Sequence, residues 1–184
     1  MRLLALSGSL RRDSINSAFC RAVAKLAEPP LAVTVYQGMG ALPLFNADLE
    51  VHVPEPVRDL RNAVTNSDAL LIASPEYAHG ISGVLKNALD WLVSFEGAAH
   101  KPVAVVNTSP RASHAHAALV EVLTTMSAQI ISEASITVPL LGACVTEEAM
   151  LQSSDVCNRI RASLLGIRGY LSGNPPSGPL FHLD

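Results

Sequence analysis

Short aliphatic runs recur along the chain, each bounded by turn residues. Four of them are rich in Leu, Val, Ile and Ala: Arg2–Leu6, Ala32–Tyr36, Ala69–Ala73 and Val103–Asn107. A weaker fifth run covers Ala134–Leu141 and is interrupted by Pro139. Because hydrophobic and polar residues do not alternate within these runs, the pattern predicts strands buried on both faces, as in a parallel sheet.

Amphipathic stretches with helical spacing separate the runs. In the first of them the apolar residues are Ile15, Ala18, Phe19, Ala22, Val23 and Leu26, and Pro29 and Pro30 follow. The same spacing predicts helices over Pro56–Asn66, Val84–Phe95, Ala115–Ser127 and Glu147–Leu171. Residues 37–55 form one long irregular connection. Five strands with intervening helices predict a doubly wound α/β sheet with right-handed crossovers.

The length of 184 residues predicts one domain over residues 1–184, with residues 173–184 as a Pro/Gly-rich C-terminal tail. Hydrophobic residues make up 49% of the chain and charged residues 16%. So few charges predict that some apolar surface is buried between subunits, in a homodimer or homotetramer. The net charge of -3 offers no basic patch for nucleic acid or an anionic membrane.

The remaining composition favours a cytoplasmic protein. The first apolar run is too short for a signal peptide, and no run approaches the length of a membrane span. Three widely spaced cysteines without a C-x-x-C pair fit a reducing compartment. His114 and His116 are two residues apart and diverge on a helix, so we expect no metal site.

Residues 7–16, between the first strand and the first helix, are crowded with hydrogen-bond donors. Ligands of open α/β sheets lie at the carboxyl ends of the strands, and helix N-termini attract anions. Ser9, Ser14 and Asn16 are neutral donors, and Arg11 is a charged donor suited to phosphate. The loop matches neither a P-loop nor a dinucleotide fingerprint. The alternative is a capped turn, with Ser14 or Asp13 as the N-cap and solvated arginines.

A second loop follows the third predicted strand and reads ASPEYAHGISGVLKNALDWL over residues 73–92. With the first loop it resembles the NAD(P)H-dependent FMN reductases, which include bacterial quinone, azo-dye and chromate reductases. The family pattern G-S-x-R-x-x-S-x-N is matched by Gly8–Asn16. The family segments P-E-Y and G-V-L-K-N-A-x-D-W are matched by Pro75–Tyr77 and Gly83–Trp91.

The resemblance implies a flavodoxin-like three-layer sandwich, with helices on both faces of a five-stranded parallel sheet of order 2-1-3-4-5. It also implies an FMN site. The residues expected around the phosphate are Ser9, Arg11, Ser14 and Asn16, and Ile15 between them is also expected to contact the cofactor. Those expected at the isoalloxazine ring are Pro75, Glu76, Tyr77 and Ala78, largely through backbone groups, together with Ser109.

This chain departs from the family pattern at three places. Ala78 stands where the family has Asn, and Ser82 stands where proline is common. After the fourth strand, a stretch that is often glycine-rich is replaced by Thr108–Arg111, in which Pro110 fixes the backbone. Thr108, Ser109 and Arg111 remain within expected reach of the flavin, so the departures bear on acceptor range rather than on cofactor binding.

The resemblance implies an oxidoreductase with FMN as cofactor and NAD(P)H as co-substrate, reducing flavin, quinone or similar small acceptors. A flavin carries the hydride chemistry itself, so no catalytic side chain is expected. Two alternatives stay open. One is a flavodoxin-like FMN electron carrier, and the other is a flavin-binding regulatory protein without turnover.

Overall fold

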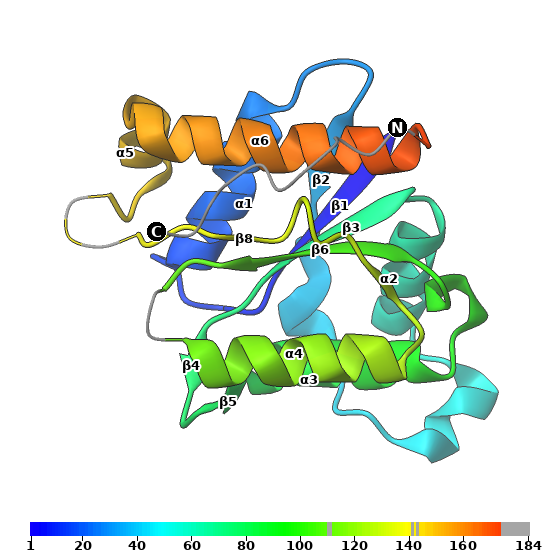
Figure 1. The fold of residues 1–184 in the computed structure, drawn as a ribbon. Coiled ribbons are helices and arrows are strands. Elements are labelled where there is room, and N and C mark those ends of the chain that lie inside the picture. The colour runs from blue at the N-terminus through cyan, green and yellow to red at the C-terminus, as the bar shows by residue number, and fades with distance from the viewer. Residues whose placement is uncertain (110–111, 141, 143, 174–184) are drawn as a thin grey trace.

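A parallel sheet forms the centre of the computed structural model, which describes residues 1–109, 112–140, 142 and 144–173 (Figure 1). Its first four positions are β2 (Ala32–Val35), β1 (Arg2–Ser7), β3 (Ala69–Ala73) and β6 (Pro102–Asn107). A fifth position lies beside β6, so the predicted order 2-1-3-4-5 is confirmed. The carboxyl ends of β1 and β3 are adjacent, with Ser7 opposite Ala73.

The fifth strand differs from its prediction. Two short pieces, β7 (Gln129–Ile130) and β8 (Ile136–Thr137), pair with the beginning and the end of β6. Between them the Ser135 hydroxyl accepts the Val105 N–H at 3.0 Å and donates to the Ile131 carbonyl at 2.9 Å. A side-chain hydrogen bond therefore replaces the backbone pairing at Val105. The fifth strand is interrupted at Ser135, before Pro139, where the sequence predicted the break.

Helices cover both faces of the sheet (Figure 1). One face packs against α1 (Ile15–Leu26), α5 (Glu147–Gln152) and α6 (Ser154–Leu171), and the other against α2 (Glu55–Thr65), α3 (Gly83–Val93) and α4 (Ser113–Thr125). Successive strand residues alternate between the two cores, with Leu3 and Ala5 in one and Leu4 and Leu6 in the other. The predicted three layers are confirmed.

Two further expectations need correction. The segment predicted as one helix over Glu147–Leu171 is two helices, because Ser153 leaves the helical conformation and its side chain caps α6. Burial on both faces holds for β1, β3 and β6 but not for β2, whose residues are exposed or half-buried. β2 lies at the edge of the sheet and has a neighbouring strand on one side only, so its aliphatic residues are less covered than those of the inner strands.

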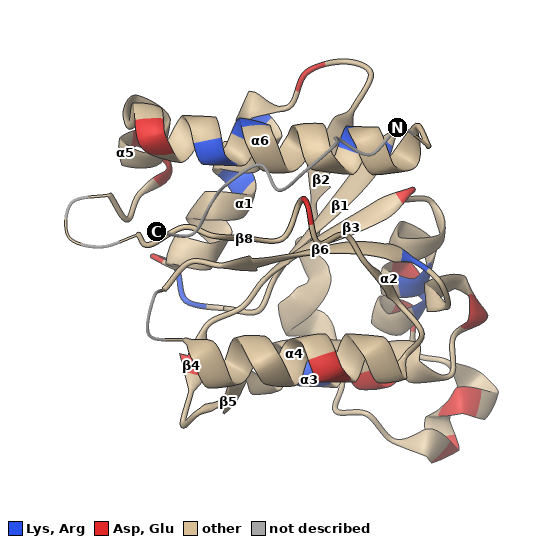
Figure 2. Ribbon diagram, viewed as in Figure 1, with Lys and Arg blue, Asp and Glu red and all other residues tan. Residues whose placement is uncertain are grey.

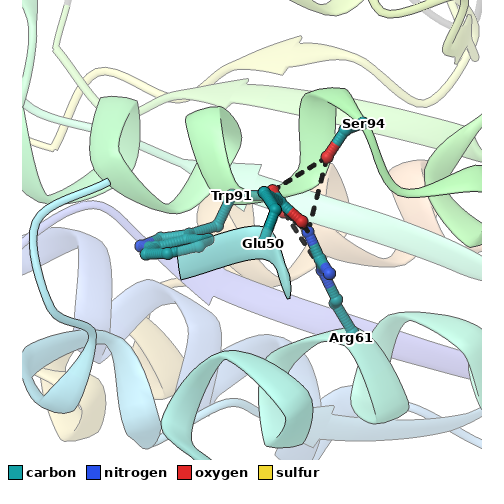
Figure 3. Close-up of polar contacts among 4 residues, drawn as sticks. All are labelled: Glu50, Arg61, Trp91 and Ser94. Atoms are coloured by element: carbon teal, nitrogen blue, oxygen red, sulfur yellow. Dashed lines mark hydrogen bonds and ion pairs between the residues drawn. The ribbon is translucent and has the colours of Figure 1, made fainter. Parts of the chain in front are cut away.

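The irregular connection over residues 37–55 contains two 3-10 turns, η1 (Gly38–Ala41) and η2 (Ala47–His52). Figure 3 shows how η2 is fastened: the Arg61 guanidinium donates to both Glu50 carboxylate oxygens at 2.9 Å and to the Trp91 carbonyl. The Ser94 hydroxyl donates to the same carboxylate at 2.9 Å. The connection is therefore held against α2 and α3 although it lacks regular structure.

The motif helix α3 supplies a second attachment. The Trp91 indole N–H and the Asn87 amide donate to the Pro43 carbonyl at 2.8 and 2.9 Å, and Phe45 N–H donates to Asn87. Trp91 is fully buried, so the last residue of the motif Gly83–Trp91 packs in the core. In the described part of the chain, no helix has the length and apolar character needed to cross a membrane.

Candidate functional site

A cavity of about 340 Å³ lies at the carboxyl ends of β1 and β3, where the two motif loops meet. Nine of the ten predicted site residues line it: Ser9, Arg11, Ser14, Ile15, Asn16, Pro75, Glu76, Tyr77 and Ser109. The tenth, Ala78, lies outside the lining, at the tip of the hairpin formed by β4 (Glu76–Tyr77) and β5 (Gly80–Ile81). Folding therefore gathers residues from three separate loops around one hollow.

The first motif forms the wall around the N-terminus of α1. Ser14 is the N-cap, and its hydroxyl accepts the Ser17 N–H at 3.2 Å, so the capping interpretation is correct for Ser14 rather than for Asp13. Capping of α1 by Ser14 is compatible with a ligand site, because Ser14 and the exposed Arg11 also line the cavity. A helix N-terminus with an adjacent guanidinium is an anion-binding arrangement.

Asn16 connects this wall to the loop after β6. Its side chain is buried, and the amide oxygen accepts the Thr108 hydroxyl at 2.9 Å. Thr108 and Ser109 both line the cavity, as the family resemblance implied. Arg111 and Pro110 lie outside the described residues. The Asn16–Thr108 bond fixes the third loop relative to α1.

The second motif forms the opposite wall. The Glu76 carboxylate accepts the Ala115 N–H at 2.8 Å and so caps the N-terminal turn of α4. Its other oxygen lies 3.4 Å from His79 Nδ1. Both carboxylate oxygens of Glu76 therefore contact other parts of the protein, which agrees with the expectation that this loop borders a ligand mainly through its backbone. Tyr77 is 53% exposed, so its ring is not packed in the core.

The hairpin tip has an unusual backbone. Ala78 and His79 have φ values of 49° and 60°, in the left-handed region that Asn and Gly tolerate best. Ala78 lacks the side-chain amide through which an asparagine hydrogen-bonds locally in this conformation. The His79 ring packs edge-on against His114 of α4, with the ring centroids 4.5 Å apart.

Ser82 joins the two motif loops. Its hydroxyl donates to the Gly8 carbonyl at 2.6 Å and accepts the Leu85 N–H at 3.2 Å as the N-cap of α3. Its φ of -58° lies in the range that proline fixes, so serine keeps the backbone conformation that proline would impose at this position and adds a helix cap. A Cβ at Gly8 would lie 2.8 Å from Ser74 Oγ and 3.0 Å from Ser82 Oγ, so a larger residue there would displace the Ser82 hydroxyl that joins the two loops.

Sequence reasoning missed three lining residues, Ser74, Ala112 and Leu140. Ser74 directly precedes the recognised Pro75 and could have been included by adjacency. Ala112 and Leu140 carry no polar signal, and only the packing of the loop after β6 and the segment after β8 brings them to the cavity.

Other candidate chemistry is weaker. Within the described ranges, no three His, Cys, Asp or Glu side chains are grouped so that they could hold a metal ion. Burial raises the pKa of the Cys20 thiol to about 12, so this thiol stays protonated and serves packing. Lys86 and Asp90, four residues apart on α3, form a surface ion pair.

The model of the NADPH-dependent FMN reductase family matches residues 1–140. The chain belongs to this family. A 2-hydroxy-1,4-benzoquinone reductase from Burkholderia is 38% identical over 112 residues, which is 59% of this chain and 61% of that protein. An NADPH:quinone oxidoreductase from Arabidopsis thaliana is 40% identical over 114 residues, covering 59% of this chain and 58% of that relative. The matches thus span about three fifths of these curated relatives.

A solved structure gives the same fold over a longer range. The flavoenzyme NAD(P)H:(acceptor) oxidoreductase FerB from Paracoccus denitrificans superposes with a TM-score of 0.71 at 28% identity. The superposition covers 95% of this chain and 98% of that one. The fold of this family member is therefore flavodoxin-like, as predicted.

Proposed function

We propose that this chain is an NAD(P)H-dependent FMN oxidoreductase that passes hydride from NAD(P)H, through bound FMN, to flavin, quinone or a similar small acceptor. The observation that carries the proposal is the cavity between the two motif loops, which contains nine of the ten residues expected at an FMN site. Family membership and the activities for which the relatives are named support the same activity.

The residues present fit FMN. Arg11, the Ser9 and Ser14 hydroxyls and the first N–H groups of α1 would hold the phosphate. Pro75 and Tyr77 would border the ring, and their backbone groups suit the N–H and C=O groups of its pyrimidine edge. When bound, the flavin supplies the hydride-transfer chemistry. The protein's task is to orient the ring, and no side chain of the cavity is assigned an acid or base role.

Anaerobic addition of NADPH or NADH to the FMN-loaded protein tests this proposal. Rapid bleaching of the flavin absorbance, followed by recovery on adding a quinone, is the expected result. Flavin that binds but is not bleached by either nucleotide would instead identify an electron carrier or a regulatory protein. Failure to bind FMN would remove the proposal altogether.

The phosphate wall has its own test. Arg11→Ala should weaken FMN binding by roughly thirtyfold, because a hydrogen bond to a charged group contributes about 2 kcal/mol. Arg11→Lys keeps the charge and should recover part of the loss. The matched control is Arg161→Ala, an exposed arginine on α6. Unchanged affinity in Arg11→Ala, measured by flavin fluorescence quenching, would show that this arginine is merely solvated.

We also propose a cytoplasmic homo-oligomer whose subunits meet on an apolar surface formed by the connection over residues 37–55 and the end of α3. Leu44, Val51 and Val93 are 83%, 79% and 62% exposed there, and the Ser94–Glu50 bond joins the two segments. Light scattering should show Leu44→Glu as a smaller species than the parent chain. Leu165→Glu, which changes an exposed leucine of α6, is the control. Equal masses for the parent chain and Leu44→Glu would reject this surface.

A further inference from the structure

A groove of about 120 Å³ lies between α6 and the segment that follows α1, and we call it the α6 groove. Four leucines and three charged residues line it: Leu26, Glu28, Leu31, Arg161, Leu164, Leu165 and Arg168. None of these residues lines the candidate flavin cavity. A ligand in the α6 groove would therefore bind together with FMN and would not compete with it.

One side of the α6 groove is a single face of α6. Its residues there are Arg161, Leu164, Leu165 and Arg168. Because the last three follow the first by three, four and seven positions, they lie on the same side of the helix. The two arginines are two turns apart, about 10 Å along the helix axis, with the leucines between them. Figure 2 shows basic positions spaced along α6.

The leucines give the α6 groove an apolar floor. Leu31 and Leu164 are 3% and 5% exposed, whereas Leu165 is 54% exposed, so part of this floor is open to solvent. Since one water molecule needs about 10–15 Å³ of such space, a groove of about 120 Å³ accommodates roughly ten non-hydrogen atoms. A nucleotide is too large for it, and a short apolar chain fits.

The charges of the α6 groove favour one anionic group. None of the ion pairs found within the described ranges involves Arg161, Arg168 or Glu28. Two guanidinium groups against one carboxylate leave an excess of one positive charge, which matches a monoanion, whereas a second negative charge would meet Glu28. A guanidinium binds a carboxylate through two parallel hydrogen bonds. Arg168 is half-buried and Arg161 is exposed, so the charge of Arg168 is the less screened.

We propose that the α6 groove binds a monocarboxylate with a flexible apolar chain, of the size of octanoate. Its carboxylate pairs with Arg168, and its chain lies over Leu164, Leu165 and the other leucines of the floor. The groove and the candidate flavin cavity have no residue in common, so this inference does not depend on the proposed reductase function.

Titration with sodium octanoate, followed by NMR through the backbone amide resonances, tests the proposal on the protein with and without FMN. Octanoate should shift amides of α6 and of the segment after α1, with the same affinity in both preparations. Each buried methylene contributes about fourfold in affinity, so butanoate, which is shorter by four methylenes, should bind more than about tenfold more weakly. Octanol keeps the chain but has no charge, and it should also bind about tenfold more weakly.

The arginine has its own variant. Arg168→Gln should weaken octanoate binding by about tenfold, because the substitution removes the charged partner of the carboxylate, and should leave octanol binding unchanged. The control is Arg58→Gln, which changes an exposed arginine of α2 on the other face of the sheet and should bind octanoate like the parent chain.

The inference fails if octanoate shifts no amide of the groove, if butanoate or octanol binds as tightly as octanoate, or if Arg168→Gln keeps the parent's affinity. Tighter binding of octanedioate than of octanoate would overturn it as well, by assigning the two arginines to two separate anionic groups. If light scattering shows that octanoate lowers the mass of the particle, the groove is a contact between copies of this chain and the inference is wrong. Failure of the protein to bind FMN would reject the proposed function and leave the octanoate result standing.

Discussion

Removal of one hydroxyl should loosen both loops of the flavin cavity. Ser82 is 1% exposed, and its hydroxyl holds the Gly8 carbonyl at 2.6 Å and the Leu85 N–H at 3.2 Å. In Ser82→Ala, loss of the helix cap costs about 1 kcal/mol. The buried Gly8 carbonyl loses its side-chain partner where water has little access, which costs about 1–2 kcal/mol more. The free energy of unfolding should therefore fall by about 2–3 kcal/mol.

For a chain of this size, each kcal/mol lowers the melting temperature by about 2–4 °C, so Ser82→Ala should melt roughly 5–10 °C lower. Calorimetric melting and urea unfolding of the flavin-free protein give the two measurements. The matched control is Ser153→Ala, because Ser153 caps α6 through a 3.4 Å bond and is half-buried. Loss of that cap alone should cost about 1 kcal/mol or less.

The difference between the two variants isolates the bond between the loops. If Ser82→Ala and Ser153→Ala lose the same stability, the Ser82–Gly8 bond contributes nothing net, and the account of Ser82 as a joint between the motifs is refuted. A loss well above about 3 kcal/mol would point instead to a rearrangement of the Gly8 loop.

Two further predictions concern strain and charge. Ala78→Gly should raise the free energy of unfolding, measured by urea titration, by up to about 1 kcal/mol, because glycine adopts the Ala78 φ of 49° without steric cost. The control is Ala99→Gly, which should not stabilise the protein because Ala99 has an ordinary φ of -63°. Equal effects of the two substitutions would refute backbone strain at Ala78. Hydrogen bonds from Lys25 and, next, from Arg21 lower the pKa of Glu147. The stability that this carboxylate contributes is therefore complete above the ordinary glutamate pKa of about 4.3 and is lost as the pH falls through the lower pKa of the folded state. In urea titrations, Glu147→Gln should therefore be less stable than the parent at neutral pH and converge with it in acid, and a stability difference that does not change with pH would refute this account of the ion pairs.

The sequence by itself determined the layered α/β fold and most of the candidate site. Its aliphatic runs marked β1, β3 and β6 because strands buried on both faces need no polar alternation. The two motif loops could be placed together because parallel strands send their carboxyl ends to one edge of the sheet. The resemblance to the family placed Thr108 and Ser109 near the flavin, and both line the same cavity.

Tertiary structure alone decided which polar groups of these residues remain available to bind a ligand and which hold the fold together. The sequence could not show that the Glu76 carboxylate caps α4, that Ser82 bonds Gly8, or that Ala112 and Leu140 complete the cavity. It also could not show that a Ser135 hydroxyl divides the fifth strand. These features are contacts between segments far apart in the chain, and local propensity carries no record of which distant partner a polar group will meet.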